Sequence, residues 1–139
     1  METEKWFTQY GTHMLPVVVQ ALKGKREGPS ILADFLSQAR FALERRHKIS
    51  QARRNFVYEQ RNSRRERQSL VRYFDVVLQS QRAHQVALET LGKFLDNNEE
   101  HLLDEALRHY ETGERYQKAR IKMRMQLTPR LCDRLFQAC

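Results

Sequence analysis

Apolar side chains recur along most of the chain at intervals of three and four residues, the spacing of an amphipathic helix rather than of a strand. Two stripes carry most of this pattern, one between residues 32 and 56 and the other between residues 70 and 95. The first consists of Leu32, Phe35, Ala39, Ala42, Ile49, Ala52 and Phe56, and the second of Leu70, Phe74, Val77, Gln81, His84, Leu88, Leu91 and Leu95. The second stripe is close to a heptad seam with two polar layers. The pattern predicts an all-α protein, a long antiparallel helical hairpin or bundle with coiled-coil-like packing and short terminal helices.

The segment between the two stripes decides whether they lie on one helix or on two. From Tyr58 to Ser69 there is no aliphatic residue, which suits either a solvated length of one very long helix or the turn of a hairpin. The 62 residues from Ser30 to Leu91 contain neither Gly nor Pro, and a tight turn normally carries such residues. Residues 29–96 are therefore interpreted as a long basic helix or a helix pair, with a continuous helix favoured.

Short helices are expected before this region. In residues 3–24, Gly11 and Pro16 favour two short helical pieces over one straight helix, because both residues weaken or break a helix.

A chain of 139 residues is long enough for one modest hydrophobic core but not for two, so a single domain is expected.

A third long helix is expected at residues 98–127. It follows a polar segment in which Asn97 and Glu100 resemble a capping box, the pairing that satisfies the free N–H groups of a first turn. Pro129 then starts a last short helix over residues 129–137, because Pro is favoured in a first turn. Its apolar face consists of Leu131, Cys132, Leu135 and Phe136.

Composition agrees with a helical protein and favours the cytoplasm. The chain contains five Gly and three Pro residues, which are too few for the many turns of an all-β fold. The longest uncharged stretch, Trp6 to Leu22, is too short and too polar to span a membrane, and the N-terminus lacks the features of a signal peptide. Cys132 and Cys139 lie so close together that a disulfide would stabilise almost nothing, so we expect two reduced thiols.

The net charge of +8 is concentrated in one part of the chain. Between Arg40 and Arg72 there are eleven basic residues against three acidic ones, so this stretch carries the whole excess. Asp96 to Glu114 holds seven acidic residues and only one arginine. Like charges three and four residues apart repel one another on a helix, so the arginines predict an acidic surface that relieves them.

Three alternatives could supply that acidic surface. The first is internal, with the acidic start of the third helix lying antiparallel beside part of the basic helix. The second is an acidic protein partner, and the third is nucleic acid bound through non-specific phosphate contacts. A helix lying on an anionic membrane is disfavoured, because the most basic stretch, Arg61 to Arg67, lacks the large apolar face that such a helix needs.

No motif in the sequence indicates catalysis, a cofactor or a metal. Carboxylate-bridged di-iron bundles need two Glu-x-x-His pairs on separate helices, and Glu44 with His47 is the only such pair. His84 lies in an apolar seam, where a histidine is more often part of a core than a ligand. No nucleophile lies on a Gly-rich elbow or a strained turn. We therefore expect a non-catalytic protein with no cofactor and no metal site.

Taken together, these patterns predict a small helical adaptor or regulatory protein. We expect it to bind an acidic protein partner through an Arg-rich helical face, with nucleic acid as the alternative ligand of the same face. The expected partner-binding residues are Arg45, Arg46, Arg53, Arg54, Arg61, Arg64, Arg65 and Arg67. Arginine suits such a face because its planar guanidinium binds carboxylate and phosphate through two hydrogen bonds at once. Apolar stripes on long helices, which one hairpin covers poorly, further predict a homodimer.

Overall fold

The computed structural model describes residues 11–24, 29–59 and 63–131. Within these ranges the chain forms helices and no strands, which confirms the predicted all-α bundle. The elements are the 3-10 helix η1 (Gly11–Met14) and the α-helices α2 (Leu15–Lys23), α3 (Pro29–Glu59), α4 (Arg64–Asn97) and α5 (His101–Gln126). Residues 129–131 are also helical, and the rest of the predicted helix 129–137, with Cys132 and Cys139, lies outside the described residues.

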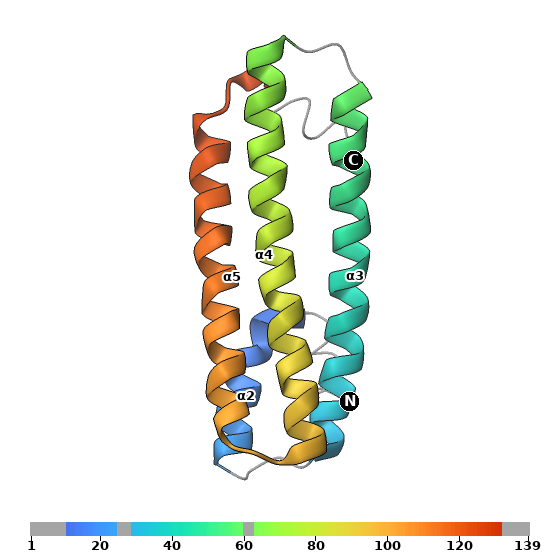
Figure 1. Cartoon of the computed structure of the whole chain (residues 1–139), viewed down its shortest axis with the longest axis vertical. Helices are drawn as coiled ribbons and strands as arrows, with labels where there is room; N and C mark the ends of the chain where they lie inside the picture. The colour runs from blue at the N-terminus through green and yellow to red at the C-terminus, as the bar shows by residue number, and fades with distance from the viewer. Residues whose placement is uncertain (1–10, 25–28, 60–62, 132–139) are drawn as a thin grey trace.

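The three long helices stand side by side, with α4 between α3 and α5 and antiparallel to both (Figure 1). The short helix α2 and η1 lie behind the row of long helices, in the half of the bundle where α3 and α5 begin (Figure 1). There α2 contacts α5, and η1 contacts α3. Pro16 occupies the first turn of α2, where its missing N–H leaves no helical hydrogen bond unmade.

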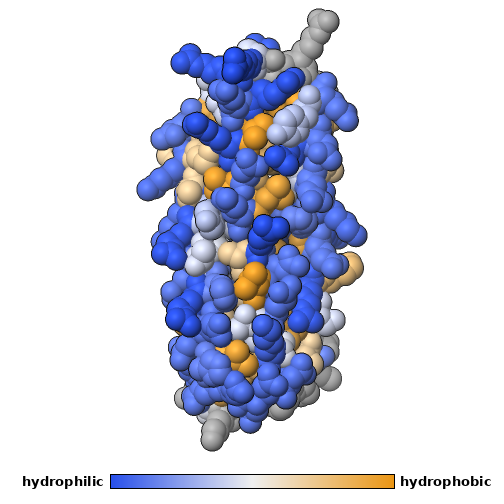
Figure 2. Space-filling model, viewed as in Figure 1, coloured by the Kyte–Doolittle hydropathy of each residue, from blue (hydrophilic) through white to orange (hydrophobic). Residues whose placement is uncertain are grey.

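The hydrophobic core is divided between the two halves of the bundle. The larger cluster joins α2 to the three long helices and centres on Leu15, Val19, Phe35, Leu88 and Leu91, each nearly inaccessible to solvent. A smaller cluster lies near the α3–α4 connection and comprises Val57, Leu70, Tyr73, Phe74 and Leu131. Figure 2 shows hydrophilic residues over most of the visible surface, with hydrophobic residues mainly in the grooves between the helices.

The favoured continuous helix across residues 58–69 is wrong. α3 ends at Glu59 and α4 begins at Arg64, and the two helices pack against each other as a hairpin. Ser63, in an extended conformation, caps α4, since its Oγ accepts a hydrogen bond from the Glu66 N–H at 3.2 Å. A Ser followed three residues later by Glu is a helix-start signal, so the sequence contained an interruption that needed neither Gly nor Pro.

The capping box predicted for Asn97 and Glu100 is also wrong. Asn97 is the last residue of α4, and Glu100 precedes α5 without any side-chain capping hydrogen bond. The boundary is instead set by Asn98, whose φ of 55° is the only positive value of a non-Gly residue within the described ranges. Asn tolerates this left-handed conformation better than most residues, and the Asn98 N–H bonds to the Phe94 carbonyl at 2.7 Å.

The inward face of α3 differs from the predicted first stripe in its second half. Leu32, Phe35 and Ala39 are buried as expected, but Ile49, Ala52 and Phe56 are exposed. The buried positions further along are Leu43, Ser50 and Val57. The true inward face therefore includes polar residues, which hydrophobic periodicity cannot detect.

No helix in the described part of the chain is both long enough and apolar enough to cross a membrane.

Replacement of the α4 cap tests the origin of the helix break. Ser63→Ala removes the hydrogen bond to the Glu66 N–H and should lower the free energy of unfolding by about 1 kcal/mol. Urea denaturation followed by circular dichroism measures this change. Ser37→Ala, at an exposed position within α3, is the matched control and should be neutral or slightly stabilising, because Ala favours a helix more than Ser does. Equal effects of the two substitutions would show that the Ser63 cap does not stabilise this end of α4.

Candidate functional site

The predicted partner-binding arginines lie on two helices rather than one. Arg45, Arg46, Arg53 and Arg54 belong to α3, and Arg64, Arg65 and Arg67 belong to the first turn of α4, while Arg61 lies outside the described residues. Because α3 and α4 form a hairpin, the first turn of α4 lies beside the end of α3 (Figure 1). We call these seven described residues the arginine surface.

Most of the arginine surface is exposed and has no acidic partner among the described residues. Arg45, Arg46, Arg64, Arg65 and Arg67 are exposed, and Arg53 is half-buried. None of these six forms an ion pair with a described acidic residue.

Arg54 differs from the other arginines because other side chains hold it in place. Its guanidinium pairs with Asp75 of α4 at 3.2 Å. The same group lies 5.3 Å from the centre of the Tyr58 ring, and its Nη2 donates to the Tyr58 hydroxyl at 3.4 Å. Arg54 therefore joins α3 to α4, and its charge is already partly satisfied.

Among the described residues, the acidic segment 96–114 forms no ion pairs with the basic stretch from Arg40 to Arg72. The ion pairs of residues 96–114 reach Lys23, His84 and His101, and none reaches the stretch from Arg40 to Arg72. The topology explains this separation. α5 begins at the end of the bundle opposite the α3–α4 connection, so its acidic first half lies far from the arginines of α4 (Figure 1).

Charge is consequently segregated along the length of the bundle. The half near the α3–α4 connection, described residues 45–59, 63–80 and 115–131, holds fifteen Lys and Arg residues against three acidic ones. The other half, described residues 11–24, 29–44 and 81–114, holds five against ten. One half is therefore strongly positive and the other moderately negative.

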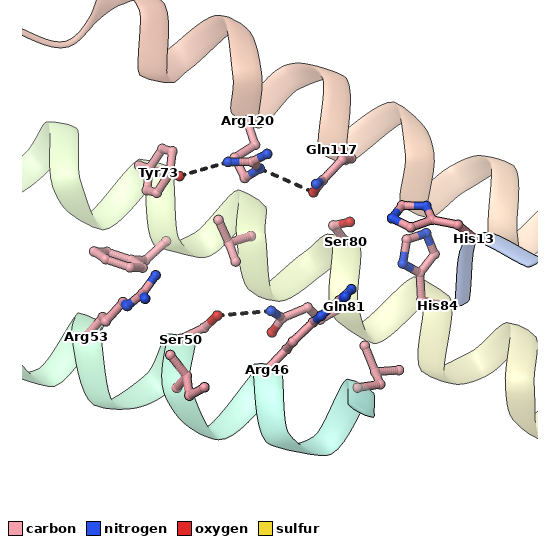
Figure 3. Close-up of a pocket in the computed structure, with 14 residues that line it drawn as sticks. His13, Arg46, Ser50, Arg53, Tyr73, Ser80, Gln81, His84, Gln117 and Arg120 are labelled. Atoms are coloured by element: carbon pink, nitrogen blue, oxygen red, sulfur yellow. Dashed lines mark hydrogen bonds between the residues drawn. The ribbon is translucent and has the colours of Figure 1, made fainter. Parts of the chain in front are cut away.

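A cleft of about 370 Å³ opens between α3 and α5, with α4 as its floor. Arg46 and Arg53 line it from α3, and Arg120 lines it from α5 (Figure 3). Tyr73, Phe74, Val77, Ser80, Gln81 and His84 of α4 form the floor, and His13, Leu43, Ile49, Ser50 and Gln117 complete the lining. No Asp or Glu is among these described lining residues.

Neutral side chains orient the polar groups of the cleft. Arg120 donates from Nη1 to the Tyr73 hydroxyl at 3.1 Å and from Nε to Gln117 Oε1 at 3.3 Å. Gln81 donates to Ser50 Oγ at 2.9 Å (Figure 3). The Arg120 guanidinium is thus held by hydrogen bonds that leave its charge uncompensated.

One end of the cleft is closed by a histidine packed into α5. The buried His84 ring stacks on Tyr110, with ring centres 5.2 Å apart, and its Nε2 lies 3.3 Å from Glu114 Oε1. Gly113 provides the space for the ring, because a Cβ there would lie 2.5 Å from Nε2 and closer still to Cδ2. The Gly113 carbonyl accepts a hydrogen bond from Ser80 Oγ at 2.9 Å, which fixes α5 against α4.

Burial controls the ionisation of this cluster. It lowers the pKa of His84 below the ordinary 6.5, and the opposing attraction of Glu114 does not compensate for it. Burial, together with the negative charge and hydrogen bond of Glu114, raises the pKa of Tyr110 to about 12. At neutral pH, His84 is therefore uncharged and Tyr110 keeps its proton. The histidine belongs to the core, as its place in the apolar seam predicted.

Within the described ranges, no three His, Cys, Asp or Glu side chains come together in a group that could hold a metal ion.

The cleft residues that sequence reasoning missed are Arg120, Tyr73 and Gln117. Arg120 belongs to a run of five basic residues between Arg115 and Arg124, but the run itself does not reveal which of them turns towards α4.

The contact between Gly113 and His84 can be tested with a double-mutant cycle. Ala is favoured over Gly within a helix by about 1 kcal/mol, but Gly113→Ala should destabilise the protein because its Cβ displaces the His84 ring. In a His84→Ala background the same substitution should be neutral or stabilising. Urea denaturation of the four proteins gives the coupling energy. An equal effect of Gly113→Ala in both backgrounds would contradict the contact.

Comparison with known proteins identifies no relative of this chain. No protein-family model, no curated protein and no solved structure matches it. The arginine surface and the cleft are therefore the features from which a function can be inferred.

Proposed function

We propose that this protein is a non-catalytic helical adaptor or regulatory protein that binds an acidic protein partner through its arginine surface. Support comes from the six arginines that have no ion pair with a described acidic residue. A cluster of uncompensated like charges lowers the stability of the isolated protein, and an acidic partner would remove that repulsion.

The observation that carries this proposal is an exposed stripe on α3. Phe41, Arg45, Lys48, Ala52 and Phe56 follow one another at intervals of three and four residues, and all five are exposed. The exposed fraction is 69% for Phe41 and 40% for Phe56, although both are large apolar side chains. Their spacing places them on one side of the helix, with basic residues between the two rings.

This composition favours a protein partner over nucleic acid. Protein interfaces are enriched in aromatic residues and arginine at their centres, where both contribute most to the binding free energy. Non-specific binding to the phosphate backbone of a duplex needs the cations but gains nothing from apolar rings beside them, and only a single strand could stack its bases on such rings. The two phenylalanines therefore match an acidic protein surface that also offers apolar contact area.

Charge reversal tests the proposal. Arg45→Glu, Arg64→Glu, Arg65→Glu and Arg67→Glu, combined in one protein, should abolish capture of an acidic protein partner from a lysate of the source cells. Helicity should be retained, because the four side chains are exposed and acidic residues are favoured in the first turn of α4. Quantitative mass spectrometry of the captured proteins and circular dichroism measure the two effects. Phe41→Ala with Phe56→Ala should weaken the same capture.

A control experiment distinguishes a specific effect of the arginine surface on capture from a general effect of the protein's net charge. Arg64→Glu with Arg65→Glu is compared with Lys118→Glu and Lys122→Glu, two exposed residues of α5 that change the net charge equally. Only the first pair should reduce capture. Equal capture by wild type and the fourfold variant would exclude the arginine surface from binding. Capture that nuclease removes, with binding to DNA or RNA that falls log-linearly with added salt, would assign the surface to nucleic acid instead.

We also propose that the protein is a homodimer associating through the end of α5. Ile121 and Met125 lie one helical turn apart, and their exposed fractions of 47% and 81% leave apolar area uncovered. Ile121→Ser with Met125→Ser should convert the dimer to a monomer, as measured by sedimentation velocity over a range of concentrations. A wild-type protein that sediments as a monomer at every concentration would refute the proposal.

A further inference from the structure

We propose that the cleft between α3 and α5 binds a small phosphate monoester whose organic group is apolar or aromatic. Of the arginine surface only Arg46 and Arg53 line this cleft, whereas Arg120 belongs to the cleft alone. The proposed contact with an acidic partner instead involves the exposed stripe of α3 and the start of α4. The inference rests on the size of the cleft, the charge of its walls, the orientation of its polar groups and its apolar floor.

The size of the cleft suits a small molecule. A volume of about 370 Å³ lies at the lower end of the range that small-molecule sites occupy, and the space is bounded on three sides by α3, α4 and α5. The cleft runs along α4 from Tyr73 to His84, two residues that are separated by roughly 16 Å along the helix axis. A whole partner helix would need a longer groove, whereas a ring with one phosphate group fits within this length.

The walls of the cleft carry positive charge only. Arg46 and Arg53 face Arg120 across the floor, and no described Asp or Glu lines the space between them (Figure 3). Arg53 Nε is out of contact with solvent and has no hydrogen-bond partner. Three guanidinium groups around one cavity match the double negative charge of a phosphate monoester better than the single charge of a carboxylate.

The polar groups of the cleft are already oriented for a ligand. Tyr73 and Gln117 hold the Arg120 guanidinium without neutralising it. Gln81 is held between Ser50 and His47, since its Oε1 lies 3.2 Å from His47 Nδ1. A ligand therefore pays little entropy to order these side chains, which is the advantage of a preorganised site.

The floor explains why the ligand should carry an apolar group. Phe74 and Val77 of α4 and Ile49 of α3 line the same space as the arginines. Ile49 is 42% exposed, so its side chain has apolar area that a ligand can cover. An inorganic phosphate ion would use the arginines but leave this area in contact with water.

Isothermal titration calorimetry with three probes tests this assignment. Phenyl phosphate should bind to one site per chain and more tightly than inorganic phosphate, because only phenyl phosphate covers the floor. It should also bind more tightly than benzoate, because benzoate has one negative charge. Titrations at matched ionic strength remove general salt effects.

Variants locate the site. Arg53→Gln and Arg120→Gln should each weaken phenyl phosphate binding by about tenfold or more, the usual effect of losing a charged hydrogen bond. Arg45→Gln and Lys118→Gln are the matched controls, because they remove one exposed charge from the same two helices outside the cleft, and should leave affinity unchanged. Arg120→Lys keeps the charge, so partial binding by this variant excludes simple unfolding of α5.

Three results would overturn the proposal. Equal weakening by the cleft and control variants would assign binding to the net positive charge of the bundle. Equal affinity for benzoate and phenyl phosphate would remove phosphate as the recognised group. No binding of phenyl phosphate by a wild-type protein of normal helicity would exclude the cleft as such a site. Capture of the acidic partner by the Arg120→Gln variant should be normal, so the two proposals can fail separately.

Discussion

A nine-residue helix, α2, has to close a bundle whose three other helices are 26 to 34 residues long. Where α2 lies, Leu15, Val18 and Val19 complete the larger apolar cluster between α3 and α5. Beyond η1, no described helix continues along this groove, and arginines line its walls above a floor that includes Phe74 and Val77. In the described part of the chain, the half of the bundle that α2 covers therefore holds the larger apolar cluster, and the cleft lies beside the smaller cluster in the half that α2 does not reach.

The His84 cluster lies where these two halves meet. His84 lines the cleft, yet its ring is buried against Tyr110 and occupies the space left by Gly113. Placing glycine within α5 costs about 1 kcal/mol relative to alanine, and the close approach of two helices around an aromatic ring offsets that cost. Ser80 adds a hydrogen bond to the Gly113 carbonyl, so the separation of α4 and α5 is fixed beside the cleft.

The agreement between sequence and structure differs from helix to helix for physical reasons. The stripe on α4 was predicted correctly from Leu70 to Leu91, because apolar packing against both neighbours maintains the periodicity. The predicted stripe on α3 is wrong after Ala42, where Ser50 is buried and the half-buried Arg53 and exposed Arg46 line the cleft. The candidate site was harder still to predict, since Arg120 meets Tyr73 only through tertiary packing. The hairpin break is present in the sequence as Ser63 and Glu66, a helix-start signal that requires neither Gly nor Pro.

The segregation of charge along the bundle gives the molecule a large electric dipole moment parallel to its long axis. A charged surface exerts a torque on such a molecule before any side chain touches it, and turns the positive end towards a negative target. At physiological ionic strength this torque acts only within about 8 Å of the surface, so it orients the final approach rather than the long-range diffusion. The α3–α4 connection would then meet a negative target first, and collisions through the opposite end would be less frequent.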